Sequence, residues 1–75
     1  METTPEQFNS AIATVIRAER AVQMMALRDL SEKTGIPTTT LMRLEKGERD
    51  IRISDLQAIA NALGTTVEEV IARAK

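Results

Sequence analysis

The segment over residues 26–47 constrains the fold of this chain more than any other, because its sequence predicts two short helices joined by a tight turn. Gly35 can take the positive φ that the end of a helix requires, and Pro37 can open the next helix with its φ already restricted. Ile36 is the apolar residue expected to fill the corner between them, and Gly47 ends the second helix. The segment is therefore a candidate helix-turn-helix unit.

The second of these helices, predicted over about residues 37–46, has two different faces. Leu41 and Leu44 recur at helical spacing, which predicts a face that packs on a core. The opposite face carries Thr38, Thr39, Met42 and Arg43. A helix that enters the major groove of DNA presents such a face to base edges. The ordinary alternative is a solvated face, but the branched Cβ of threonine lowers helix propensity without a gain in packing. Three threonines in succession at a helix start are easier to explain if their hydroxyls cap the helix or contact DNA.

Capping patterns predict three further helices. Thr4 and Gln7 form a capping box that starts a helix ending near residues 20–21. A second capping box begins at Ser54, and Thr66 caps a short final helix. Since the sequence has no strand-like alternation and no internal repeat, the expected fold is all-α, a compact arrangement of five helices.

Three apolar residues outside the central unit have an expected place in the core. Phe8 is the only aromatic residue of the chain and is expected to anchor the first helix. Met24 and Met25 link the first helix to the central unit, and their flexible side chains are expected to fill gaps in the core.

Length and composition limit the class of protein. The 75 residues are expected to form a single domain, residues 1–75. The chain has no cysteine and no histidine, so we expect no disulfide, no metal and no cofactor. No apolar run approaches membrane-spanning length, and the expected location is the cytoplasm of a bacterial or phage-infected cell. The net charge of −1 neither supports nor excludes binding to nucleic acid.

Three blocks of sequence together resemble the lambda-repressor/Cro-like helix-turn-helix family. They are LRDLSEKTGI at residues 27–36, TLMRLEKG at residues 40–47, and residues 53–64, which end in Leu-Gly. The resemblance covers about residues 17–71, and small phage or prophage regulators are the nearest type. It implies a five-helix lambda-repressor-like domain that binds double-stranded DNA.

The resemblance also implies roles for individual positions. Base contacts fall on the four exposed residues of the second motif helix, and phosphate contacts fall on the start of the first motif helix and the loop after the second. The residues at these phosphate positions are Leu27, Arg28, Lys46, Arg49 and Arg52. The family pattern further implies a structural ion pair between Arg20 and Glu45. The ordinary reading of the three basic loop residues is that they only add solubility.

Two departures from the family pattern concern the phosphate contacts. The family often begins its first motif helix with a polar residue and a glutamine, where this chain has Ala26 and Leu27. Only backbone N–H groups could bind phosphate there. A loop proline common in the family is also missing between Gly47 and Ile53.

Catalysis has no residues to support it. Histidine and cysteine are absent, Ser31 has no base partner, and there is no glycine-rich phosphate loop or metal-ligand spacing. We therefore expect no enzyme and no small-molecule substrate. The leading hypothesis is a sequence-specific transcriptional repressor that reads the major groove. The alternative is an antitoxin or phage adaptor that uses the same fold to bind a protein.

A DNA-binding domain of this size commonly reads two half-sites as a dimer. The last helix carries the apolar residues Val67, Val70 and Ile71, which either close the core or join two copies. The first helix is the other candidate for a homodimer contact.

Overall fold

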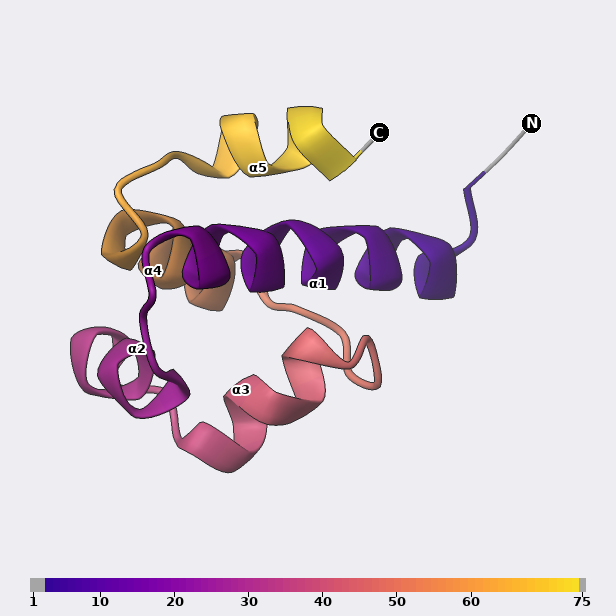
Figure 1. The fold of residues 1–75 in the computed structure, drawn as a ribbon. Coiled ribbons are helices and arrows are strands. Elements are labelled where there is room, and N and C mark those ends of the chain that lie inside the picture. Colours follow the sequence, from indigo (N-terminus) through magenta and orange to yellow (C-terminus); the bar gives the residue numbers. More distant parts are fainter. Residues whose placement is uncertain (1–2, 75) are drawn as a thin grey trace.

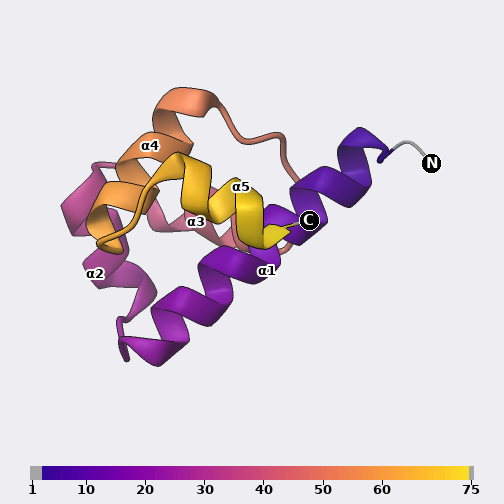
Figure 2. The same ribbon diagram turned by 90° about the horizontal axis from the view of Figure 1, so that it is seen from above.

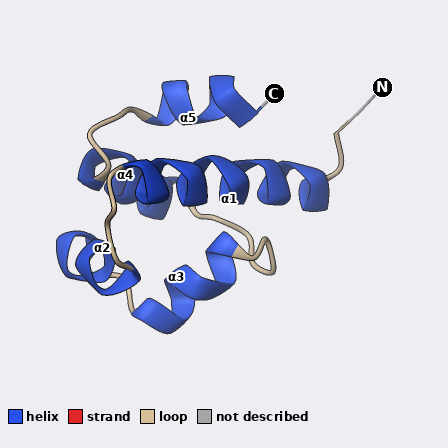
Figure 3. Cartoon of the chain, in the orientation of Figure 1, coloured by secondary structure: helices blue, strands red, loops and turns tan. Residues whose placement is uncertain are grey.

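Five helices follow one another in the computed structural model, which describes residues 3–74 (Figure 1). They are α1 (Pro5–Val22), α2 (Leu27–Thr34), α3 (Thr38–Glu45), α4 (Ile53–Ala62) and α5 (Val67–Ala74). No strand occurs in the described range, and short loops join the helices (Figure 3). The prediction of an all-α fold with five helices is confirmed, and α2 with α3 forms the helix-turn-helix unit.

The longest helix, α1, lies between α5 on one side and α3 on the other (Figure 1). The helix α4 packs against α2 and α5. Seen from above, the first turns of α1 extend beyond the other helices (Figure 2). Within residues 3–74 no helix combines the length and the apolar character needed to cross a bilayer.

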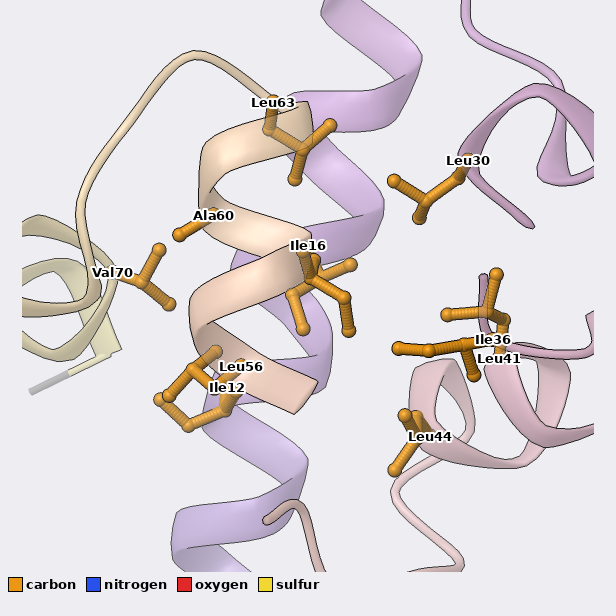
Figure 4. Close-up of a cluster of buried hydrophobic side chains, with 11 residues drawn as sticks. Ile12, Ile16, Leu30, Ile36, Leu41, Leu44, Leu56, Ala60, Leu63 and Val70 are labelled. Carbon is orange, nitrogen blue, oxygen red and sulfur yellow. The ribbon is translucent and has the colours of Figure 1, made fainter. Parts of the chain in front are cut away.

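Every helix contributes apolar side chains to one buried cluster (Figure 4). In the close-up, the side chains of Leu41 and Leu44 point from α3 toward α1 and α4. The cluster consists of Ile12, Ile16, Leu30, Ile36, Leu41, Leu44, Leu56, Ile59, Ala60, Leu63 and Val70. Burial of these side chains supplies the main driving force for folding, and it also fixes which face of α3 turns outward.

Two of the three predicted helix caps are present. At α1 the Thr4 hydroxyl accepts from the Gln7 N–H at 3.1 Å, and the Gln7 side-chain oxygen accepts from the Thr4 N–H at 2.9 Å. At α5 the Thr66 hydroxyl accepts from the N–H of Glu69 at 3.1 Å. These bonds satisfy N–H groups that the first turn of a helix leaves without a backbone partner.

The predicted cap at Ser54 is wrong. The helix α4 begins one residue earlier, at Ile53, and Arg52 is its N-cap residue without a side-chain bond. The carbonyl of Arg52 already accepts from the N–H of Leu56 at 2.9 Å, which puts Ser54 inside the first turn. Pro37 is likewise the N-cap of α3 and not its first helical residue.

Two of the expected core residues are exposed instead. Phe8, in the first turn of α1, is 43% exposed. Met24 is 91% exposed and has a left-handed backbone with φ of 52°, which turns its side chain away from the core. Met25 is half-buried and packs against the core as expected.

Gly47 requires the absence of a side chain for two independent reasons. Its φ of 71° lies in the left-handed region, and a Cβ atom there would lie 3.3 Å from the Cα of Ser10 in α1. The loop after α3 therefore meets α1 backbone to backbone at this point. Gly64, after α4, has a similar φ of 74° but open space around it.

Gly47→Ala is expected to destabilise the fold more than Gly64→Ala. The left-handed conformation costs an alanine about 1–2 kcal/mol at either position, and the contact with Ser10 adds about 1 kcal/mol at position 47 alone. Urea denaturation of the two variants measures the difference. Equal losses would show that α1 yields to the added methyl group.

The helix α5 is held on α1 by apolar contacts and by an ion pair. Val70 is buried, while Val67 and Ile71 are half-buried and pack against the core. The Arg73 guanidinium donates to the carboxylate of Glu19 and lies 3.4 Å from that of Glu69. The hydrogen bond from Arg73, with a second from Gln23, lowers the pKa of Glu19 below its ordinary value.

Acid is expected to remove the contribution of Glu19 to stability. Since its pKa is lowered in the folded state, the contribution is fully present above the unfolded value of about 4.3 and is lost as the pH falls through the folded value. The Tm difference between the wild type and Glu19→Gln should therefore shrink between about pH 6 and about pH 3. Thermal melts followed by circular dichroism measure it, with Glu68→Gln as the control, and a difference independent of pH would contradict the assignment.

Candidate nucleic-acid interface

The outer face of α3 exposes the four residues that the sequence assigns to base contacts. Thr38, Thr39, Met42 and Arg43 are all exposed, and Met42 is 45% exposed. The inner face of the same helix is fully buried through Leu41 and Leu44. Among the described residues no side-chain hydrogen bond caps the start of α3, so its threonine hydroxyls are not used for that purpose. The face is therefore a row of short polar groups, a thioether and a guanidinium open to solvent.

The C-terminal end of α3 closes with two backbone hydrogen bonds. The N–H of Glu48 donates to the carbonyl of Arg43, and the N–H of Gly47 donates to the carbonyl of Leu44, both at 3.1 Å. This is the pattern of a Schellman motif with glycine in the left-handed position. The carbonyl of Glu45 is not used by these bonds, and it accepts instead from the guanidinium of Arg17 in α1.

The side chain of Glu45 forms a bidentate ion pair with Arg20 of α1. The Nε and Nη2 atoms of Arg20 each lie 2.8 Å from a carboxylate oxygen, and its Nη1 donates to the carbonyl of Met25 at 2.9 Å. Glu45 is 6% exposed and is the only buried charged residue in the described range. The hydrogen bonds with Glu45 raise the pKa of Arg20 above its ordinary value. The end of α3 is thus fixed to α1 by charge as well as by packing.

The loop from residue 46 to residue 52 carries the expected phosphate contacts on its exposed side. Lys46, Arg49 and Arg52 are all exposed. Ile51 is half-buried and packs against the core, which anchors the loop. A second anchor is the hydrogen bond of 2.7 Å from the side-chain amide of Asn9 to the carboxylate of Asp50.

The start of α2 is where the sequence predicts a phosphate contact through backbone N–H groups. The side chain of Leu27 is half-buried and packs against the core, while Arg28 is exposed. The carboxylate of Asp29 accepts from the N–H of Ala26 at 3.1 Å. A negative charge from the protein itself therefore lies at this helix start, where a phosphate would compete with it.

Sequence reasoning missed the contacts made by Arg17 and Asn9. Both join α1 to the end of α3 or its loop, across 28 and 41 residues of sequence. The one available signal was spacing, because Arg17 precedes Arg20 by three residues and so shares its face of α1.

Comparison with known proteins agrees with this geometry. A sequence model described as helix-turn-helix matches residues 16–70. No curated protein sequence matches the chain significantly.

Solved structures of transcriptional regulators superpose closely on the chain. A crystal structure of the clp gene regulator ClgR from Corynebacterium glutamicum has a TM-score of 0.86 and 28% identity, covering 89% of this chain and 71% of that one. A second structure of ClgR has a TM-score of 0.85 and 28% identity, covering 89% and 86%. An HTH_3 family transcriptional regulator from Vibrio cholerae has a TM-score of 0.85 and 28% identity, covering 92% of this chain and 39% of that one.

Arg20→Met is expected to lower the free energy of unfolding by about 2–4 kcal/mol, because it leaves the buried carboxylate of Glu45 without its partner. Adding Glu45→Gln should recover part of that loss, since the double variant no longer buries an unpaired charge. Urea denaturation of both single variants and the double variant gives the coupling energy.

Arg73→Met is the matched control, because it removes an exposed ion pair between helices and should cost far less. If Arg20→Met is no more destabilising than this control, the buried pair does not hold α3 to α1.

Proposed function

This chain belongs to the helix-turn-helix family of DNA-binding transcriptional regulators, and from that membership we propose that it is a sequence-specific repressor that reads double-stranded DNA with α3. Members of this family are regulators and not enzymes. The observation that carries the proposal is the division of α3 into a buried and an exposed face. The buried leucines hold the helix, and the exposed row is available to the major groove.

The chemistry of the exposed row suits base edges. The guanidinium of Arg43 can donate two parallel hydrogen bonds to O6 and N7 of a guanine. The hydroxyls of Thr38 and Thr39 can bond to bases or phosphates, and their methyl groups, like the thioether of Met42, can contact a thymine methyl. These four residues are the proposed specificity determinants.

Phosphate binding is assigned mainly to the loop after α3. Lys46, Arg49 and Arg52 lie beside the end of the recognition helix, where the DNA backbone would pass. At the start of α2 the contribution is limited to Arg28 and the backbone of Leu27, against the opposing charge of Asp29. We expect a modest affinity that falls with salt.

Regulation follows from occupancy of DNA. The chain acts as one DNA-binding domain. Two copies join through α5 or through the exposed first turns of α1 and bind neighbouring half-sites, so that the complex covers a promoter. Because its target is chromosomal or phage DNA, the site of action is the cytoplasm of a bacterial or phage-infected cell.

A second candidate function is favoured by the charge of the molecule. The net charge is −1, and Asp29 lies at the helix start where the family pattern expects a phosphate contact. In this alternative the exposed face of α3 binds a protein, as in an antitoxin or a phage adaptor.

Binding to DNA from the region upstream of its own gene tests the proposal. The purified protein should bind this DNA saturably and more tightly than random duplex, and the preference should survive a higher salt concentration. Equal, weak binding to both duplexes would favour the protein-binding alternative.

The two classes of contact are expected to respond differently to mutation. Arg43→Ala should cost about 1–3 kcal/mol on the operator and relax specificity there, because it removes a base contact. Lys46→Ala or Arg49→Ala should weaken operator and random duplex alike and lower the slope of log K against log[salt] by about 0.9 each. Fluorescence anisotropy titrations at several salt concentrations measure both effects. An Arg43→Ala variant that binds the operator like the wild type would remove Arg43 from the base-reading set.

A further inference from the structure

We propose that Arg17 is a positioning residue for DNA reading, which fixes the end of the recognition helix through the backbone carbonyl of Glu45. This proposal rests on the proposed function and adds a residue to it. Arg17 is exposed and lies on α1, and its guanidinium donates to the Glu45 carbonyl and, at 3.4 Å, to the hydroxyl of Thr14.

The position of this bond follows from how α3 ends. The last carbonyls of any helix have no partner within the helix itself. In α3 the carbonyls of Met42, Arg43 and Leu44 accept from backbone N–H groups of residues 46–48. The Glu45 carbonyl is the next one along, and the guanidinium of Arg17 supplies its donor. A cation at this end also interacts favourably with the helix dipole.

Arg17 and Arg20 act on different parts of the same residue. Arg20 holds the carboxylate of Glu45, so it acts on the helix through three rotatable side-chain bonds. Arg17 holds the main chain directly. The ion pair therefore keeps α3 close to α1, while the bond from Arg17 limits rotation and fraying of its last turn.

The last turn matters because base-reading and phosphate-contacting residues are close to it. Arg43 lies two residues before Glu45, and Lys46 follows directly after it. The carbonyl of Arg43 is itself part of the same closure, since it accepts from the N–H groups of Lys46 and Glu48 at 3.2 and 3.1 Å. A looser helix end would misdirect Arg43, and the loss would fall on specific binding.

The test compares Arg17→Met, Arg17→Lys and the control Arg73→Met on operator and random duplex. Methionine keeps the apolar stem and removes the donors, whereas lysine keeps the charge and one donor that can reach a carbonyl. The control removes the same charge and also a contact between α1 and another helix, α5. Because α5 is one of the two proposed dimer contacts, analytical ultracentrifugation verifies that Arg73→Met leaves the oligomeric state unchanged. Circular dichroism melts verify that each variant is folded.

Arg17→Met should bind the operator about tenfold more weakly than Arg73→Met does. The affinity of Arg17→Met for random duplex should stay within about twofold of that of Arg73→Met, and the two variants should share the same slope of log K against log[salt]. Arg17→Lys should restore most of the operator affinity. Two results would overturn the proposal: unchanged operator affinity, or equal losses on both duplexes with a flatter salt slope, which would make Arg17 a phosphate contact.

Amide hydrogen exchange in the free protein separates this proposal from the proposed function. Arg17→Met should speed exchange of the Lys46, Gly47 and Glu48 amides about tenfold, relative to the amides in the middle of α4. If the wild type shows no preference for its operator, the proposed function fails, and faster exchange would still support Arg17 as the residue that fixes this helix end. Unchanged exchange would overturn the positioning role whatever the DNA result.

Discussion

The buried carboxylate of Glu45 is the constraint on which the arrangement of this fold depends. A charge that is only 6% exposed must be paired, or the fold loses several kcal/mol. Within residues 3–74, the guanidinium of Arg20 is the group that meets both of its oxygens, so α1 and the end of α3 must approach in one register. Apolar packing by itself tolerates small shifts, whereas a bidentate ion pair does not. The orientation of the recognition helix is therefore specified by a polar contact placed at the edge of an apolar core.

The first helix acts as the scaffold for both functional segments. Along one side it contacts the loop through Asn9 and Ser10 and the end of α3 through Arg17 and Arg20. Elsewhere it carries the ion pair with α5. The exposed row on α3 and the basic residues of the loop thus share one support. Which of these two proposed DNA-contacting segments a change in α1 disturbs depends on the contact that the change removes.

Local chemistry in the sequence predicted most of the fold. The caps at Thr4 and Thr66 and the left-handed Gly35 depend on neighbouring residues only, and the structure has all three. The errors arise where tertiary surroundings decide. Phe8 is exposed although it is apolar, and nothing in its neighbouring sequence indicates that. The bonds from Arg17 and Asn9 join segments far apart in sequence, so only the folded chain brings them together.

The charge of the surface explains why the geometry of α3 should matter so much here. The loop carries Glu48 and Asp50 among its basic residues, and Asp29 lies at the start of α2. Acidic groups next to the expected phosphate positions weaken the electrostatic attraction to the DNA backbone, which in most DNA-binding domains does not depend on the DNA sequence. If the chain reads an operator as proposed, a larger share of the binding energy must then come from base contacts, which depend on angle and distance. The end of α3 is held both at the carboxylate of Glu45, by Arg20, and at its backbone carbonyl, by Arg17. These two contacts fix the angle and position of the helix that base contacts require.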